Sequence, residues 1–344
     1  MQSITDVDSV CVSEIDAPKI DALGQLQDMF AGDMEQVNQV ILDQMQSDVP
    51  LIPQVASYLI ASGGKRVRPL LTLAATSLFS GDMARAHGLA AAVEFIHTAT
   101  LLHDDVVDSS DERRGKESAN IVFGNEASVL VGDFLFSRAF QLMVAGGSLT
   151  VLDILSTASA VIAEGEVKQL SIQNDIDTSK EDYLSVIEGK TASLFAAACE
   201  VGPVIANQSE ALVVAMRSYG HNLGMAFQII DDLMDYSSSR AAMGKAIGDD
   251  FKEGKITAPI LFSLQQADKQ EREFWQRVIG DKEQRQGDFD HALSLIYKYD
   301  GLGQSKALAH DYGARALSAL EIMPAGAVRS LLQDLINFTI ERNF

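Results

Sequence analysis

Cysteine, proline and tryptophan are scarce, with two, seven and one in 344 residues. Two cysteines, Cys11 and Cys199, cannot form a disulfide scaffold and match no metal-ligand spacing, which indicates a reducing compartment. Proline disrupts helix interiors. Because its share here is about 2% against an average of about 5%, the sequence leaves room for long helices.

Positive charge is also scarce. The 27 Lys and Arg residues face 48 Asp and Glu, so the net charge is −21 and the isoelectric point is about 4.6. A general nucleic-acid-binding protein needs excess basic residues to neutralise phosphates, so we exclude nucleic acid as a partner. A hydrophobic content of 47% excludes a largely disordered chain.

Signals for export and membrane insertion are missing. The apolar stretches are interrupted by Glu94, Asp133 and Glu164 and stay below the roughly 18 residues of a membrane span. The first thirty residues are acidic before Lys19, the opposite of a signal or transit peptide. We therefore expect a soluble cytoplasmic protein without a transmembrane segment.

Apolar residues recur at spacings of three and four, which is typical of helices. We find no sustained alternation joined by hairpin signals, and no long low-complexity linker. The sequence predicts an all-α single domain over 26–344 after a flexible extension over 1–25. The main helical segments are expected at 84–108, 119–145, 149–173, 194–206, 210–236 and 258–266.

Two similar acidic clusters each end a helical segment. The first reads Leu-Leu-His-Asp-Asp-Val-Val-Asp over 101–108, and the second reads Gln-Ile-Ile-Asp-Asp-Leu-Met-Asp over 228–235. The outer aspartates of each cluster share a helix face, and the middle one lies about 100° round. The outer pairs are Asp104 with Asp108 and Asp231 with Asp235, and the middle residues are Asp105 and Asp232.

Paired aspartates at a helix C-terminus repel each other and oppose the helix dipole. An ordinary acidic helix end is the alternative, but its repetition in one chain favours a bound cation. Carboxylates without histidine or cysteine at ligand spacing suit a hard ion, and Mg²⁺ fits best because it also binds substrate phosphates. We therefore expect the two clusters to bind Mg²⁺.

Basic residues are concentrated where a phosphate could bind. Lys65 and Arg68 follow the pair Gly63-Gly64, and Arg113 and Arg114 follow the first acidic cluster. Exposed backbone N–H groups beside fixed cations are typical of phosphate sites. His97 lies two turns before the first cluster on roughly the same face. A solvated basic patch and a structural histidine are the alternatives.

Together these motifs resemble the trans-polyprenyl (E-isoprenyl) diphosphate synthases, and are most similar to bacterial octaprenyl, solanesyl and decaprenyl synthases. The resemblance covers about residues 35–344. Ile256 departs from it, since relatives often have proline there. The motifs are Gly-Gly-Lys-Arg-Val-Arg-Pro over 63–69, the two acidic clusters, Arg-Arg-Gly over 113–115 and Glu-Gly-Lys-Thr over 188–191. They continue with Gly-Lys at 244–245, Gly-Asp-Asp over 248–250 and Gly-Lys at 254–255.

The resemblance implies an all-α bundle with a central active-site cavity, usually a homodimer, that condenses isopentenyl diphosphate onto an allylic diphosphate such as farnesyl diphosphate. It implies a long-chain product that supplies the ubiquinone side chain. The implied catalytic residues are Asp104, Asp105, Asp108, Asp231, Asp232, Asp235 and Lys190. The implied Mg²⁺ ligands are Asp104, Asp108, Asp231 and Asp235. The implied substrate contacts are Lys65, Arg68, His97 and Arg114 for isopentenyl diphosphate, Arg113, Lys190, Lys245 and Lys255 for the allylic diphosphate, and Thr191 and Gln228 in the carbocation region.

We expect the helical turn that precedes the first acidic cluster to influence the length of the product. Ala99 and Thr100 are small, whereas family members with short products often place bulky aromatics there. We expect a growing chain to pass this turn. Phe140 or Met143, on the next predicted helix, is the hypothesis for the tunnel floor.

Three other interpretations stay open at this stage. A shorter, geranylgeranyl-type product is one. A class I terpene cyclase usually has a single Asp-Asp-x-x-Asp cluster, and a non-catalytic regulatory subunit should have degraded motifs. The sequence leaves open a transient membrane contact during product release.

Overall fold

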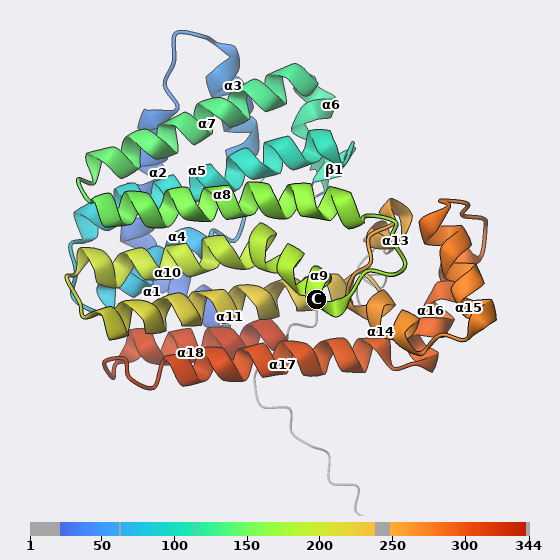
Figure 1. The fold of residues 1–344 in the computed structure, drawn as a ribbon. Coiled ribbons are helices and arrows are strands. Elements are labelled where there is room, and N and C mark those ends of the chain that lie inside the picture. The colour runs from blue at the N-terminus through green and yellow to red at the C-terminus, as the bar shows by residue number, and fades with distance from the viewer. Residues whose placement is uncertain (1–20, 62, 114, 238–247, 342–344) are drawn as a thin grey trace, which may run out of the picture.

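The computed structural model describes residues 21–341 except 62, 114 and 238–247. Helices dominate this part of the chain, which confirms the all-α prediction (Figure 1). A short hairpin of β1 (Glu112–Arg113) and β2 (Lys116–Glu117) follows the first acidic cluster. The helices are α1 (Ala22–Met29), α2 (Ala31–Gln44), α3 (Leu51–Ala61), α4 (Val67–Ser77), α5 (Met83–Val107), α6 (Ala119–Phe123), α7 (Asn125–Ala145), α8 (Leu149–Ile172), α9 (Lys180–Ile187), the π-helix η1 (Glu188–Ala192), α10 (Ser193–Ile205), α11 (Glu210–Met234), α13 (Asp249–Glu253), α14 (Ala258–Gln266), α15 (Lys269–Trp275), the π-helix η2 (Gln276–Gly280), α16 (Asp288–Lys298), α17 (Gly301–Ala319) and α18 (Ala327–Ile340).

The long helices lie side by side as one bundle around a continuous hydrophobic core (Figure 1). Helix α5 packs against α4 and α7, and α10 packs against α4, α8 and α11. Helix α11 also packs against α17, while α13 to α16 gather at one end of the bundle. Helices α5 and α11 both end there, so the topology brings the two acidic clusters to the same end.

Most predicted helix bounds are confirmed to within a few residues. One correction concerns 119–145, which divides into α6 and α7 at Gly124. Gly124 has φ 89°, a left-handed conformation that glycine adopts without steric cost. A second correction concerns the expected extension over 1–25. Asp21 caps α1, and Ala22 and Leu26 are fully buried, so the folded part begins before residue 25.

Helix α7 is long and apolar enough to cross a membrane by length and composition alone, which the interruption at Asp133 led us not to expect. It is the one such helix in the described residues, and core helices of soluble proteins pass the same test. Within the bundle α7 buries Val131, Leu135 and Met143 and packs along α5.

Helices α4 and α10 meet closely at Gly202. A Cβ there would lie 2.5 Å from the backbone carbonyl carbon of Ala75 and 2.6 Å from the amide nitrogen of Thr76. We expect Gly202→Ala to lower the free energy of unfolding by about 2 kcal/mol, because overpacking forces two helix backbones apart.

Gly88→Ala, within helix α5, is the matched control because no atom lies within 4 Å of its added Cβ. Alanine should stabilise that helix by up to about 1 kcal/mol. Urea unfolding of both variants measures the difference. Equal stability of the two would contradict the close approach of α4 and α10.

Candidate active site

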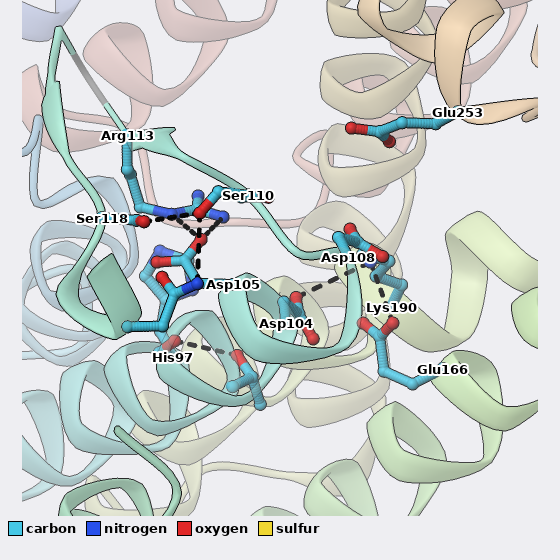
Figure 2. A network of polar contacts seen from close by, with 12 residues as sticks. His97, Asp104, Asp105, Asp108, Ser110, Arg113, Ser118, Glu166, Lys190 and Glu253 are labelled. Carbon is cyan, nitrogen blue, oxygen red and sulfur yellow. Dashed lines mark hydrogen bonds and ion pairs between the residues drawn. The ribbon is translucent and has the colours of Figure 1, made fainter. Parts of the chain in front are cut away.

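The first acidic cluster lies at the C-terminal end of α5, where it meets a lysine from η1. Lys190 Nζ lies 3.6 Å from Asp104 and 2.9 Å from Glu166 of α8 (Figure 2). Burial raises the pKa of both carboxyl groups, and the Lys190 charge opposes that rise. The structure thus places Lys190 beside the first cluster, and it adds a carboxylate that the sequence did not single out.

Two glycines make this contact possible. A Cβ on Gly165 would lie 2.9 Å from the Lys190 amide nitrogen and 3.0 Å from the Gly189 Cα. Because neither glycine has a side chain, α8 and η1 approach closely, and Glu166 and Lys190, each the next residue, come into contact. A π-helix such as η1 inserts one residue into a helix and often marks a functional site.

A second lysine reaches the same cluster from the other half of the chain. Lys255 Nζ lies 3.1 Å from Asp108 and 2.5 Å from Glu253. These acids raise the pKa of Lys255, although burial acts in the opposite direction. Lys190 and Lys255 therefore hold opposite ends of the first cluster with fixed positive charge. Ile256, which replaces the usual proline, is buried directly after Lys255.

The middle aspartate of the first cluster does not share this environment. Asp105 is 1% exposed and accepts hydrogen bonds from Arg113 at 2.6–2.7 Å (Figure 2). The ion pair fixes the β1–β2 hairpin against α5. Arg113, expected at the allylic diphosphate, is thus held by Asp105.

In the second cluster the middle aspartate is again enclosed by protein donors. Asp232 is 5% exposed and accepts hydrogen bonds from Tyr183 at 2.7 Å and from Gln228 at 2.8 Å. Burial raises the pKa of Asp232 to about 7, although both hydrogen bonds lower it. Asp231, by contrast, is exposed, and Asp235 accepts a hydrogen bond from a backbone N–H of α13.

Thr191 and Gln228 connect η1 to the second cluster. The Thr191 hydroxyl donates to the Gln228 amide oxygen at 2.8 Å, and Gln228 lies one turn before Asp232. Lys190, the residue before Thr191, faces the first cluster. Two consecutive residues of η1 therefore contact the two acidic helices, α5 and α11. Thr191 and Gln228, both expected in the carbocation region, are thus brought together by the structure.

The side chains that converge here fit a hard divalent cation. The donors are carboxylate oxygens, the ligands that Mg²⁺ prefers. One oxygen of Glu166, Oε1, is buried without a hydrogen-bond partner next to Asp104, and burial raises the pKa of both groups. A cation would offset that cost. Among the described residues, no three His, Cys, Asp or Glu side chains form a complete metal cage.

The basic residues expected to bind isopentenyl diphosphate lie around His97, two turns before Asp104 on α5. Arg68 Nη1 lies 3.2 Å from His97 Nε2, so the predicted pair is brought together. Lys65 is exposed on the loop before α4, and Arg66, at that helix's N-cap, pairs with Glu94. Arg114 and Lys245, both predicted at the site, lie outside the described residues.

The turn below Asp104 contains the residues expected to control product length. Ala99 is fully buried, and the Thr100 hydroxyl donates to the carbonyl of His97 at 2.8 Å. The prediction that Phe140 or Met143 forms the tunnel floor needs a correction. Met143 is fully buried, but Phe140 is 38% exposed and contacts Phe136, so Phe140 lies on the outer face of α7 and not at a tunnel floor.

The position of the buried face around α7 explains why Phe140 was wrongly predicted at the tunnel floor. Its buried row runs through Val131, Leu135, Ala139 and Met143, at intervals of four residues. Because α7 is apolar on several faces, the spacing of its aromatic residues did not identify the inner one.

Sequence reasoning also missed site residues. Glu166, Tyr183 and Glu253 carry no motif of their own. Glu166 and Tyr183 are recruited by contacts distant in sequence, whereas Glu253 pairs with Lys255 two residues further on. The available signal for Glu166 was the glycine before it, since a matching glycine precedes Lys190.

Comparisons with known proteins agree with this site. The sequence matches the polyprenyl synthetase family over residues 49–296. It is 42% identical over 323 residues to octaprenyl diphosphate synthase of Haemophilus influenzae, with 94% of this chain and 98% of that protein covered.

Two solved structures are also similar. A decaprenyl diphosphate synthase from Rhodobacter capsulatus has a TM-score of 0.90 and 48% identity, covering 94% of this chain and 99% of that one. A polyprenyl synthase from Caulobacter crescentus, complexed with calcium and isoprenyl diphosphate, has a TM-score of 0.89 and 50% identity, covering 94% and 98%. On the fold, the paired acidic clusters and these similarities, the chain belongs to the polyprenyl synthetase family.

Proposed function

We propose that this protein is a long-chain trans-polyprenyl diphosphate synthase, with a product in the octaprenyl to decaprenyl range. It condenses isopentenyl diphosphate onto an allylic diphosphate such as farnesyl diphosphate, acts in the cytoplasm and supplies the ubiquinone side chain. The observation that carries the proposal is that Lys190 and Lys255 hold Asp104 and Asp108 of the first acidic cluster. The segments that carry these lysines also bind the second acidic helix, through Thr191 to Gln228 and through the backbone N–H of Asp250 to Asp235. The octaprenyl, nonaprenyl and decaprenyl names of its relatives support the length.

The proposed reaction begins with loss of diphosphate from the allylic carbon. Mg²⁺ held by Asp104, Asp108, Asp231 and Asp235 would supply Lewis-acid stabilisation of the departing diphosphate. Lys190 and Lys255 now neutralise acidic side chains, and they would exchange these partners for the oxygens of the diphosphate. Fixed cations stabilise negative charge as it develops, without reorganisation.

The second substrate must lie close to the resulting carbocation. Arg68 and His97, with the exposed Lys65, offer positive and hydrogen-bonding groups two turns before Asp104 on α5. The double bond of isopentenyl diphosphate then attacks the cation to form the new carbon–carbon bond, and the released diphosphate takes up the proton that is lost. Orienting two polyanions together accounts for much of the barrier lowering, and the surrounding apolar bundle excludes water that would quench the cation.

We also propose a homodimer. Large apolar side chains are exposed on the outer faces of α7 and α8, among them Leu130, Val144 and Val167 at 65–67% exposure. Apolar side chains gathered on one face are typical of protein contact sites. Phe140 belongs to the same outer face.

The decisive experiment incubates the purified chain with labelled isopentenyl diphosphate, farnesyl diphosphate and Mg²⁺. Chromatography of the dephosphorylated products should give alcohols of eight to ten isoprene units on the proposed function. Products that stop at four units would indicate a geranylgeranyl-type enzyme, and a cyclic hydrocarbon would indicate a cyclase. Activity that requires a second protein would indicate a regulatory subunit.

Product length tests the direction in which the chain grows. Thr100→Phe places a large ring one turn below Asp104, and we expect the main product to shorten by several isoprene units. Val107→Phe, on an exposed position of the same helix, is the matched control and should leave the length unchanged. An unchanged product in Thr100→Phe would mean that the chain takes another route.

A further inference from the structure

A hydrogen-bonded chain behind the second acidic cluster links three helical segments. The Tyr183 hydroxyl of α9 donates to one oxygen of Asp232, and the Gln228 amide donates to the other. The Thr191 hydroxyl then donates to the amide oxygen of Gln228. Tyr183 is 3% exposed, so its bond to Asp232 is shielded from water.

Both oxygens of Asp232 are therefore engaged by protein donors. A buried carboxylate with two donors is well satisfied, and loss of one leaves charge that burial makes costly. Asp232 is consequently an anchor of α11 and not a residue free to contact a ligand. On a helix Asp231 lies about 100° and Asp235 about 60° round from Asp232, both to the same side.

The same chain sets the orientation of Gln228. The amide nitrogen of Gln228 donates to Asp232, and its amide oxygen is left for the Thr191 hydroxyl. Close packing reinforces this arrangement one turn earlier, where a Cβ on Gly224 would lie 2.7 Å from the Ala192 Cα. Helix α11 is thus held against η1 by contact and by directional bonds.

We propose that Tyr183 is a positioning residue, which fixes the rotation of the last turn of α11 so that Asp231 and Asp235 face the first cluster. Tyr183 touches neither substrate nor metal and acts through Asp232. The inference rests on the proposed function, since it assigns the second cluster to the diphosphate that leaves.

Tyr183→Phe keeps the buried ring and removes the hydroxyl. We expect kcat to fall about tenfold while KM for isopentenyl diphosphate stays within about twofold. Mg²⁺-dependent binding of inorganic pyrophosphate, measured by calorimetry, should weaken about fivefold.

Tyr219→Phe is the matched control. Tyr219 is also fully buried, and its hydroxyl donates to the Leu332 carbonyl at 2.9 Å, at a contact between α11 and α18. This variant should lower the melting temperature about as much as Tyr183→Phe does, with kcat and pyrophosphate binding unchanged.

The outcomes separate the two proposals. If Tyr183→Phe matches Tyr219→Phe in kcat and in pyrophosphate binding, or if both variants lose activity alike, the positioning role is wrong. If the unmodified protein elongates no allylic diphosphate, the proposed function fails, and pyrophosphate binding by the same two variants still decides the role of Tyr183.

Discussion

Asp104→Ala is expected to reduce prenyl condensation on the order of 10³-fold, because it removes a carboxylate from the metal-binding pair of the first cluster. The fold should survive. Asp104 is largely buried and burial raises its pKa, so its charge is costly to the folded state, and Lys190 keeps Glu166 as a partner. Steady-state turnover with farnesyl and isopentenyl diphosphates measures the loss, and thermal unfolding checks the fold.

Asp111→Ala provides the control for this variant. Asp111 is an exposed carboxylate a few residues beyond the same cluster, and its loss should change turnover by less than about twofold, as is usual for surface positions. Near-normal turnover in Asp104→Ala would overturn the assignment of the first cluster to catalysis.

Lys190→Met should have the second largest effect. The substitution keeps the length of the side chain but removes the charge that lies between Glu166 and Asp104. We expect kcat/KM to fall on the order of 10²-fold, because the departing diphosphate loses a fixed cation. The measurement is kcat/KM for the allylic diphosphate at saturating isopentenyl diphosphate.

Stability should also become more dependent on pH in Lys190→Met. Burial raises the pKa of Asp104 and Glu166, and Lys190 opposes the rise, so both values should move further upward in the variant. An acid whose folded pKa lies above its unfolded value stabilises the fold below that unfolded pKa and loses this contribution as the pH rises. The stability deficit of the variant should therefore grow as the pH rises above the usual pKa range of these carboxyl groups, reaching about 1–3 kcal/mol.

Lys168→Met is the matched control, on α8. Lys168 pairs with Asp182 at 3.1 Å, and both side chains are more than one third exposed. A surface ion pair contributes about 0–1 kcal/mol, so this variant should keep both its turnover and its pH profile. If Lys190→Met behaves like Lys168→Met, the charge of Lys190 has no special role.

Local features of the site followed from the sequence. The spacing of Asp104 and Asp108 places them on one helix face whatever the fold, because helix geometry is fixed within a few residues. The same holds for Gln228, one turn before the second cluster. Helix ends were predictable where glycine or a loop follows, and α14 begins and ends as expected.

The contacts between distant segments could not be predicted in this way. Glu166 contacts Lys190 because two glycines let α8 and η1 approach each other. Tyr183 of α9 contacts Asp232 of α11, which lies 49 residues further along the chain. Neither pair has a spacing that a single helix imposes. Arg113 illustrates the same limit, since its ion pair with Asp105 depends on the fold of the β1–β2 hairpin.

The amino-acid order by itself determined the helices, the faces that carry the aspartates and the chemistry those carboxylates suit. Only the tertiary structure decided how each helix is rotated against its neighbours, as the outward position of Phe140 and the inward position of Met143 on α7 demonstrate. The physical reason is that periodicity fixes which side chains share a face. When several faces of a helix are apolar, packing against the other helices selects the one that is buried.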